Sequence, residues 1–311
     1  MMKKICIIGA NGLLGNKLLQ TIHHYDLIGT FNQTTINSPN IELVQLDITK
    51  FENCNYLLKA KPDFIINTAA ITNVDFCEKY PEKSYLVNVT GVKNLVKISN
   101  TLDCKLIHIS TDGIFSGREE NYKEDDETGP VNYYGKTKLE SENKVKCLEN
   151  YLIFRTNLLY GYMSKNQIIS RSDYVKPTNF VLWILSKLNK KTSIDIVNDQ
   201  ISNPTLVDNL AQIIMASLDK NLVGTFHATD TTCISRFDFA KKIANKFGFS
   251  EHLISEISSQ DLEQFAPRPS KTCLNCSKIQ KMGISLSSVE QSLDNLFNQI
   301  QEKNPTMIST N

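Results

Sequence analysis

Two side chains that could move a proton lie in the stretch PVNYYGKTK, residues 130–138. Tyr134 and Lys138 are four residues apart, so on a helix they share one face, whereas Tyr133 has no lysine at that spacing. A tyrosine titrates at about 10, and a neighbouring ammonium group lowers that pKa by stabilising the phenolate. The spacing therefore favours Tyr134 as a proton donor to a carbonyl oxygen that receives a hydride. By itself, the same spacing is more often an accident of an amphipathic helix.

Hydroxyl groups follow an apolar run upstream of this pair. The run CKLIHIS, residues 104–110, has the length and composition of a buried strand, and Ser110, Thr111 and Asp112 stand at its end. Ligands of open α/β sheets bind outside the carboxyl ends of the strands, so these residues could face a substrate. Serine and threonine at strand ends also commonly cap turns, which leaves both roles open.

A glycine-rich turn follows the first apolar run of the chain. It has the pattern G-x-x-G-x-x-G and consists of Gly9, Ala10, Asn11, Gly12, Leu13, Leu14 and Gly15. Glycines let the backbone turn sharply and approach a pyrophosphate, and the N-terminus of the following helix offers unpaired N–H groups to its charge. Between the first strand and the first helix of a βαβ unit, this pattern predicts a dinucleotide site.

The choice between the two nicotinamide cofactors depends on the end of the second strand. An acidic residue there would pair with the ribose hydroxyls of NAD, and an arginine would favour the additional phosphate of NADP. The segment TFNQTTINSPN, residues 30–40, has neither. Because no carboxylate repels a 2′-phosphate, the sequence slightly favours NADPH and leaves NADH open.

These groups are held by alternating strands and helices. Apolar runs of strand length occupy residues 3–9, 25–31, 41–47, 63–70, 104–110 and 151–156, and helical patterns occupy 12–24, 82–102 and 133–150. Such alternation predicts a Rossmann-like, doubly wound α/β fold with a parallel sheet.

We expect an NAD(P)-binding Rossmann domain over residues 1–160. Residues 161–311 would form a smaller, mainly substrate-binding region, with some elements at about 192–220 returning to the sheet. Further helices are expected near 178–190, 206–219, 235–247 and 287–302, and a strand near 193–197.

The overall composition excludes several kinds of partner. The formal charge is +1, from 34 basic and 33 acidic residues, so no long-range field favours nucleic acid or an anionic membrane. The N-terminus has too short an apolar core for a signal peptide, and no run of 18 or more apolar residues occurs, so we expect a cytoplasmic protein. The one C-x-x-C pair, Cys273 and Cys276, lacks a second pair and an adjacent histidine, which favours ordinary reduced thiols over a metal site.

In this order, the glycine turn, the strand-end hydroxyls and the tyrosine–lysine pair resemble the extended short-chain dehydrogenases/reductases. More closely, the chain resembles the dTDP-4-dehydrorhamnose reductases and their sugar-nucleotide-modifying relatives. The matching segments are GANGLLG, PDFIINTAAITNVDFCEKYPEKSYLVNVTGV, HISTDGIFSG, PVNYYGKTKLESE, FRTNLLYG, NDQISNPTLVDNLA and APRPSKTCLN. The resemblance implies NAD(P)H-dependent reduction of the 4-keto group of a nucleotide-linked deoxysugar, dTDP-4-dehydrorhamnose or a close analogue, in the synthesis of surface-polysaccharide precursors.

The resemblance also implies roles for individual residues. Thr111 would hydrogen-bond the substrate carbonyl, Tyr134 would protonate it, and Lys138 would hold the nicotinamide ribose. Further cofactor contacts would come from Gly9, Asn11, Gly12, Leu13, Leu14, Gly15, Asp47, Ile48, Ala69 and Ala70. Further substrate contacts would come from Asp112, Asn88, Asp199, Asn203, Pro204, Thr205 and Arg268, of which Asn88 could equally join a helix to a strand.

Two features depart from the pattern of this family. Gly113 stands where rhamnose-forming reductases usually carry a tyrosine and where dehydratases carry an acid, which argues against dehydration and for a wider pocket. The segment from residue 162 to 183 is longer than the usual connection.

Two alternatives stay open beside reduction. They are a sugar-nucleotide epimerase of the same fold and a non-catalytic NADP-binding regulatory subunit of the kind that partners methionine adenosyltransferase. The oligomeric state is also open, with a homodimer as one option.

Overall fold

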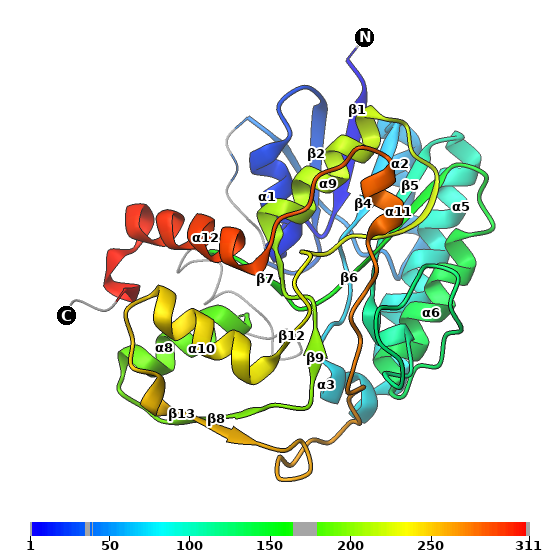
Figure 1. Cartoon of the computed structure of the whole chain (residues 1–311). Coiled ribbons are helices and arrows are strands. Elements are labelled where there is room, and N and C mark those ends of the chain that lie inside the picture. Colours follow the sequence, from blue (N-terminus) through cyan, green and yellow to red (C-terminus); the bar gives the residue numbers. More distant parts are fainter. Residues whose placement is uncertain (1, 35–37, 39, 164–178, 309–311) are drawn as a thin grey trace.

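One seven-stranded parallel sheet organises the chain (Figure 1). The computed structural model describes residues 2–34, 38, 40–163 and 179–308. The strands lie in the order β11-β6-β5-β4-β1-β2-β3. Their bounds are β1 (Lys4–Ile8), β2 (Asp26–Phe31), β3 (Glu42–Gln45), β4 (Phe64–Asn67), β5 (Lys105–Thr111), β6 (Tyr151–Thr156) and β11 (Gly224–His227). The six strands predicted in the first half and the doubly wound α/β class are confirmed.

Strand β1 shows why both faces of the sheet are apolar. Ile5 and Ile7 belong to one core, with residues of α1 (Leu13–Thr21) and α9 (Val207–Asp219). Cys6 and Ile8 belong to the other core, with residues of α2 (Phe51–Ala60) and α5 (Val92–Leu102). Successive side chains of a strand point to opposite faces, so a continuous apolar run serves both helix layers. The helix α2 was missed by the sequence analysis.

The predicted helix over residues 82–102 is built from three segments. It begins with α4 (Pro81–Tyr85), passes through a π-helical turn, η1 (Leu86–Gly91), and continues as α5. The short helix α3 (Val74–Lys79) precedes it, and α6 (Tyr133–Val145) packs beside α5. A π-helical turn is often found at functional sites because it shifts the register of the helix.

A second group of elements has its own apolar core. Helices α8 (Phe180–Asn189), α10 (Arg236–Lys246) and α12 (Val289–Lys303) surround it, together with the parallel pair β8 (Ile194–Val197) and β13 (Ile254–Ile257). The predicted helices and the strand near 193–197 are therefore present. Most of the long connection noted in the sequence, residues 164–178, lies outside the described residues.

The elements that return to the main sheet differ from the expected ones. Helix α9 packs on α1, and β11 pairs with β6. Strand β8, expected within the returning segment at about 192–220, pairs with β13 instead. The expectation was therefore wrong for β8. The partner of a strand can lie many residues further along the chain, so nothing local in the sequence indicates it.

Short elements connect the two groups. Two-residue strands pair β7 (Leu159–Tyr160) with β10 (Thr205–Leu206), and β9 (Ile201–Ser202) with β12 (Ile234–Ser235). Single turns form η2 (Asp112–Ile114), η3 (Glu251–Leu253), α11 (Ser277–Lys281) and η4 (Pro305–Met307).

One cysteine differs from the expectation of reduced thiols. Cys273 forms a disulfide with Cys233, across a sequence separation of 40, while Cys276 is buried and free. The expectation was wrong for Cys273, because its partner belongs to a different loop that only the fold brings close. In the described part of the chain, every helix is too short or too polar to cross a membrane.

Candidate active site

A cavity of about 1610 Å³ runs along the carboxyl ends of the sheet strands and reaches α8 and the segment around β9. Small-molecule sites usually measure roughly 300–1,000 Å³, so this cavity has room for a dinucleotide and a second ligand. Most of the residues predicted from the sequence line it, namely Gly9, Asn11, Gly12, Leu13, Leu14, Asp47, Ile48, Ala69, Ala70, Thr111, Asp112, Tyr134, Lys138 and Arg268.

The glycine turn fits a dinucleotide. Gly9 has φ +78°, and a Cβ atom there would lie 3.0 Å from the Cα atom of Ala69. A Cβ atom at Gly15 would lie 2.3 Å from the carbonyl oxygen of Gly9, so Gly15 lets α1 pack on the turn and does not itself line the cavity. Helix α1 begins at Leu13, and its N-cap residue Gly12 provides no side-chain cap, which leaves the first N–H groups of the helix available for a pyrophosphate.

The end of β2 supplies the residues that face the adenosine side of such a ligand. Asn32, Gln33 and Thr34 line the cavity, and the Asn11 amide donates to the carbonyl oxygen of Thr34 at 3.0 Å. As the sequence indicated, no carboxylate or arginine stands among these three residues.

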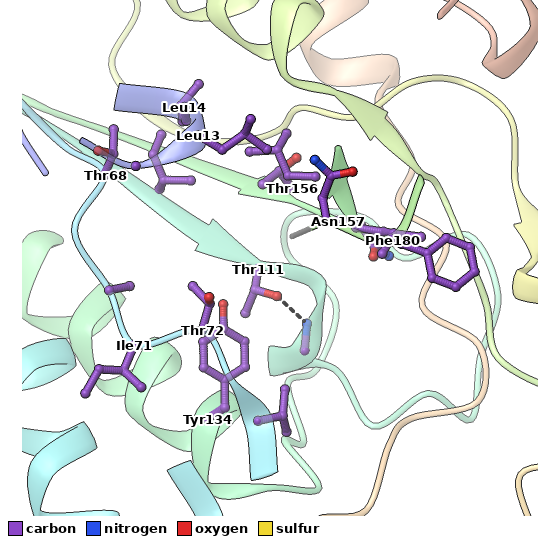
Figure 2. Close-up of a pocket in the computed structure, with 18 of the residues that line it drawn as sticks. Leu13, Leu14, Thr68, Ile71, Thr72, Thr111, Tyr134, Thr156, Asn157 and Phe180 are labelled. Carbon is purple, nitrogen blue, oxygen red and sulfur yellow. Dashed lines mark hydrogen bonds between the residues drawn. The ribbon is translucent and has the colours of Figure 1, made fainter. Parts of the chain in front are cut away.

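Tyr134 and Thr111 meet inside the cavity. Thr111 is the last residue of β5, and Tyr134 lies in the first turn of α6, whose N-cap residue Asn132 accepts a hydrogen bond from the N–H of Gly135 at 2.9 Å. Figure 2 shows the hydroxyl end of Tyr134 pointing toward Thr111 and Thr72. The Thr111 hydroxyl donates to Asp112 at 2.9 Å and accepts from the N–H of Gly113 at 3.1 Å. Two hydroxyl groups on different elements thus face one space.

The expected lowering of the Tyr134 pKa is not found. Burial raises the pKa of Tyr134; the nearby Thr111 hydroxyl opposes this change, and the charges of Cys77 and Asp112 add to it. The Lys138 ammonium instead donates to the carbonyl oxygen of Ile109 at 2.6 Å. The expectation of a lowered pKa was therefore wrong. Tyr134 is a neutral phenol, which is the form that can donate a proton.

Lys138 also lies beside a histidine that the sequence analysis missed. The Nε2 atom of His108 is 3.2 Å from Lys138 Nζ and 3.0 Å from the hydroxyl of Ser141. Burial lowers the pKa of His108 well below its usual value, and the charge of Lys138 lowers it further, so the imidazole is neutral. Burial likewise lowers the pKa of Lys138 to about 8, although the charge of Glu142 opposes the change.

The tautomer of His108 follows from its neighbours. The N–H of Ala69 donates to the Asn67 side-chain oxygen at 3.1 Å, so the Asn67 amide nitrogen faces His108 Nδ1, at 3.2 Å. Nδ1 is then an acceptor, and the imidazole proton lies on Nε2. Lys138 Nζ therefore meets an N–H group, which further disfavours its charged form.

A buried ion pair fixes α6 against the ends of β5 and β6. Arg155 donates to both carboxylate oxygens of Glu142, at 3.0 and 2.9 Å, and the Ser110 hydroxyl donates to the same carboxylate at 2.6 Å. Burial alone would raise the pKa of Glu142, but the hydrogen bonds and charge of Arg155, with Ser110, lower it overall. Ser110 thus serves the scaffold, one residue before Thr111. The sequence analysis missed this pairing, because Glu142 is one of many charged residues on a helix.

Gly113 leaves free space beside Thr111 and Tyr134. A Cβ atom at Gly113 would lie 3.5 Å from the Thr111 hydroxyl oxygen and 3.9 Å from the Tyr134 ring, which are ordinary contact distances. The backbone therefore accepts a side chain at this position, and its absence widens the cavity as the sequence indicated.

Asp112 and Arg268 line the cavity from different parts of the chain. The Asp112 carboxylate accepts hydrogen bonds from Thr111, Asn157 and Thr272. Burial raises the pKa of Asp112, although the hydrogen bonds from Thr272 and Thr111 oppose the change. Arg268 forms an ion pair with Asp75 at 2.9 Å and donates to the carbonyl oxygen of Ala266 at 2.7 Å.

Five residues expected to touch the substrate do not line the cavity. Asn88 bonds to the backbone of Ile71 and to Thr137, which is the structural role left open for it. Asp199 accepts hydrogen bonds from Ser258 and Ser259. The others, Asn203, Pro204 and Thr205, are buried. The cavity is lined instead by Gln200, Ile201 and Ser202 of the same stretch, of which Ile201 and Ser202 form β9.

The family described as RmlD substrate binding domain matches residues 2–302. The chain belongs to this family. A relative from Haloferax volcanii, described as the probable low-salt glycan biosynthesis reductase Agl14, is 32% identical over 92% of this chain and 95% of its own length. The dTDP-4-dehydrorhamnose reductase of Aggregatibacter actinomycetemcomitans is 30% identical over 95% of this chain and 98% of its own.

A solved structure supports the same assignment. The dTDP-4-dehydrorhamnose reductase of Bacillus anthracis, in complex with NADP, superposes with a TM-score of 0.84 at 30% identity, over 96% of this chain and all (100%) of the other. The resemblance to sugar-nucleotide reductases of the extended short-chain dehydrogenase/reductase type is thereby confirmed.

Proposed function

We propose that this chain is an NAD(P)H-dependent reductase of the 4-keto group of a nucleotide-linked deoxysugar, dTDP-4-dehydrorhamnose or a close analogue, acting in the synthesis of polysaccharide precursors. The observation that carries the proposal is the meeting of Thr111 and Tyr134 in one cavity with the glycine turn. The names of the relatives point to the same chemistry.

The nicotinamide cofactor, when bound, supplies the hydride. The residues of the chain supply the proton and the alignment. Thr111 and Tyr134 would both hydrogen-bond the ketone oxygen, and Tyr134 would donate its phenolic proton as negative charge develops there. Lys138 would hold the ribose and return a proton to Tyr134, a role that suits a pKa of about 8. Gly113 supplies no acid for eliminating water.

The substrate proposal is tested by a cofactor-oxidation screen. The protein is incubated with NADPH and with NADH in the presence of 4-keto sugars linked to dTDP, UDP, GDP and CDP, and the absorbance at 340 nm is followed. We expect oxidation with at least one of them. Sugar conversion without net cofactor oxidation would instead indicate an epimerase, and co-purification with a synthetase without any turnover would indicate a regulatory subunit.

The two neighbouring tyrosines provide a matched pair of variants. We expect Tyr134→Phe to lower kcat about a hundredfold or more, which is what the loss of a general acid costs. Tyr133→Phe should change kcat little, because the side chain of Tyr133 does not line the cavity and its N–H donates to Glu78. Equal losses in both variants would contradict the assignment of Tyr134.

A further inference from the structure

Arg236 enters the cavity from the second group of elements, and its backbone is fixed there. It is the first residue of α10, directly after β12, which pairs with β9 through Ser235 and Ile201. The N–H of Arg236 donates to the carbonyl oxygen of Gln200 at 3.0 Å. Both Arg236 and Gln200 line the cavity. The side chain is thus carried into the cavity by a short sheet and not by a free loop.

The guanidinium of Arg236 packs against an aromatic ring. Its Cζ atom lies 5.5 Å from the centre of the Phe180 ring, which also lines the cavity. Within residues 2–34, 38, 40–163 and 179–308, it makes neither a hydrogen bond nor an ion pair. Arg268, in contrast, is paired with Asp75.

The charged groups that face Arg236 do not replace such a partner. Asp112 attracts it and Arg268 repels it, and burial outweighs both and lowers the pKa of Arg236 to about 10. The Asp112 carboxylate is already taken by hydrogen bonds from Thr111, Asn157 and Thr272. A partly buried guanidinium with no anionic partner within the described residues costs stability, so its presence in a ligand cavity indicates that an anionic ligand completes it.

We propose that Arg236 is a substrate-binding residue that holds the diphosphate group of the nucleotide-linked substrate. The inference rests on the proposed function and names the part of the substrate that Arg236 recognises. A planar guanidinium with several donors matches phosphate oxygens in a bidentate manner. The diphosphate is the anionic group that nucleotide sugars share, whatever their base or sugar. Arg268 lines the same cavity, but its charge is balanced by Asp75, so Arg236 supplies a positive charge that no ion pair within the described residues balances.

The test measures binding of nucleoside diphosphates without turnover. Isothermal titration of dTDP, UDP, GDP and CDP is carried out on the protein saturated with NADP⁺, for the natural chain and for Arg236→Gln, Arg236→Lys and Arg118→Gln. We expect Arg236→Gln to weaken the best diphosphate about tenfold or more, and Arg236→Lys to weaken it less. Arg118→Gln should bind like the natural chain, because Arg118 is exposed and lies outside the cavity lining. An unchanged affinity for NADP⁺ shows that each variant is folded.

The outcomes separate this inference from the proposed function. If the natural chain binds a diphosphate and Arg236→Gln binds it equally well, the inference is overturned while the substrate class stands. If Arg236→Gln keeps its diphosphate affinity but loses activity on the sugar nucleotide, Arg236 serves the sugar and the inference is also overturned. If the natural chain binds no nucleoside diphosphate, both the inference and the nucleotide-sugar class fail.

Discussion

Cofactor preference is decided by single side chains. Asn32 comes directly after the last residue of β2 and lines the cavity. In related folds a carboxylate at this strand end binds the ribose hydroxyls of NAD, and it would repel a 2′-phosphate. The amide of Asn32 carries no charge and is compatible with either cofactor.

We therefore expect Asn32→Asp to shift the preference toward NADH. The new carboxylate should raise the KM for NADPH about tenfold or more and change the KM for NADH much less, because only the former carries the 2′-phosphate. Asn32→Ser, which removes the amide without adding charge, is the control. Steady-state kinetics with both cofactors provide the measurement. Equal changes in the two KM values would show that residue 32 does not set the cofactor preference.

At the scale of elements, the site depends on how closely α6 approaches the end of β5. A Cβ atom at Gly135 would lie 2.1 Å from the carbonyl oxygen of Gly113 and 2.9 Å from the side chain of Pro130. The first turn of α6 therefore rests directly on the backbone of η2. This contact sets the separation between Tyr134 and Thr111, and the Glu142–Arg155 pair secures the same helix two turns later.

The two glycines at this contact should respond differently to alanine. We expect Gly135→Ala to lower the free energy of unfolding by about 2–4 kcal/mol, because backbone atoms cannot yield to the added methyl group. Gly113→Ala should change it by less than about 1 kcal/mol, since the nearest atom would be 3.5 Å away. Urea unfolding followed by circular dichroism measures both. Similar losses of stability in the two variants would show that the close contact between α6 and the backbone of Gly113 is not what makes Gly135 necessary.

At the scale of the whole molecule, Asp230 joins the sheet to both groups of helices. It follows β11, and its carboxylate accepts hydrogen bonds from Asn209 of α9, from Ser292 of α12 and from the N–H of Leu206. Burial raises the pKa of Asp230 to about 6; the hydrogen bonds from Ser292 and Asn209 oppose the change. The charge of Asp230 therefore costs stability at neutral pH.

The sign of the pH effect follows from this raised pKa. The folded protein holds its proton more tightly than the unfolded chain does, so the stabilising contribution is complete below about 3.8 and is lost as the pH rises through about 6. Between pH 7 and pH 4, we expect the natural chain to gain up to about 3 kcal/mol in free energy of unfolding relative to Asp230→Asn. Urea unfolding at several pH values compares the natural chain with Asp230→Asn. If their free energies of unfolding changed with pH in parallel, Asp230 would not be the source of the pH dependence.

Local sequence patterns were sufficient to predict the six strands of the first half and the glycine turn, and they favour Tyr134 over Tyr133 as the proton donor. These features depend on residues close together in the chain, where periodicity, turn chemistry and the spacing of one helical turn act directly. The α/β class and the family follow from the same local patterns.

Which charged groups face one another depends on how distant segments of the chain fold together. The Cys233–Cys273 disulfide, the pairing of β8 with β13 and the burial that raises the Tyr134 pKa all depend on segments far apart in sequence. The same is true of His108 against Lys138 and of Arg236 in the cavity. Desolvation and electrostatic attraction act across space, so a lysine four residues from a tyrosine can face a backbone carbonyl instead.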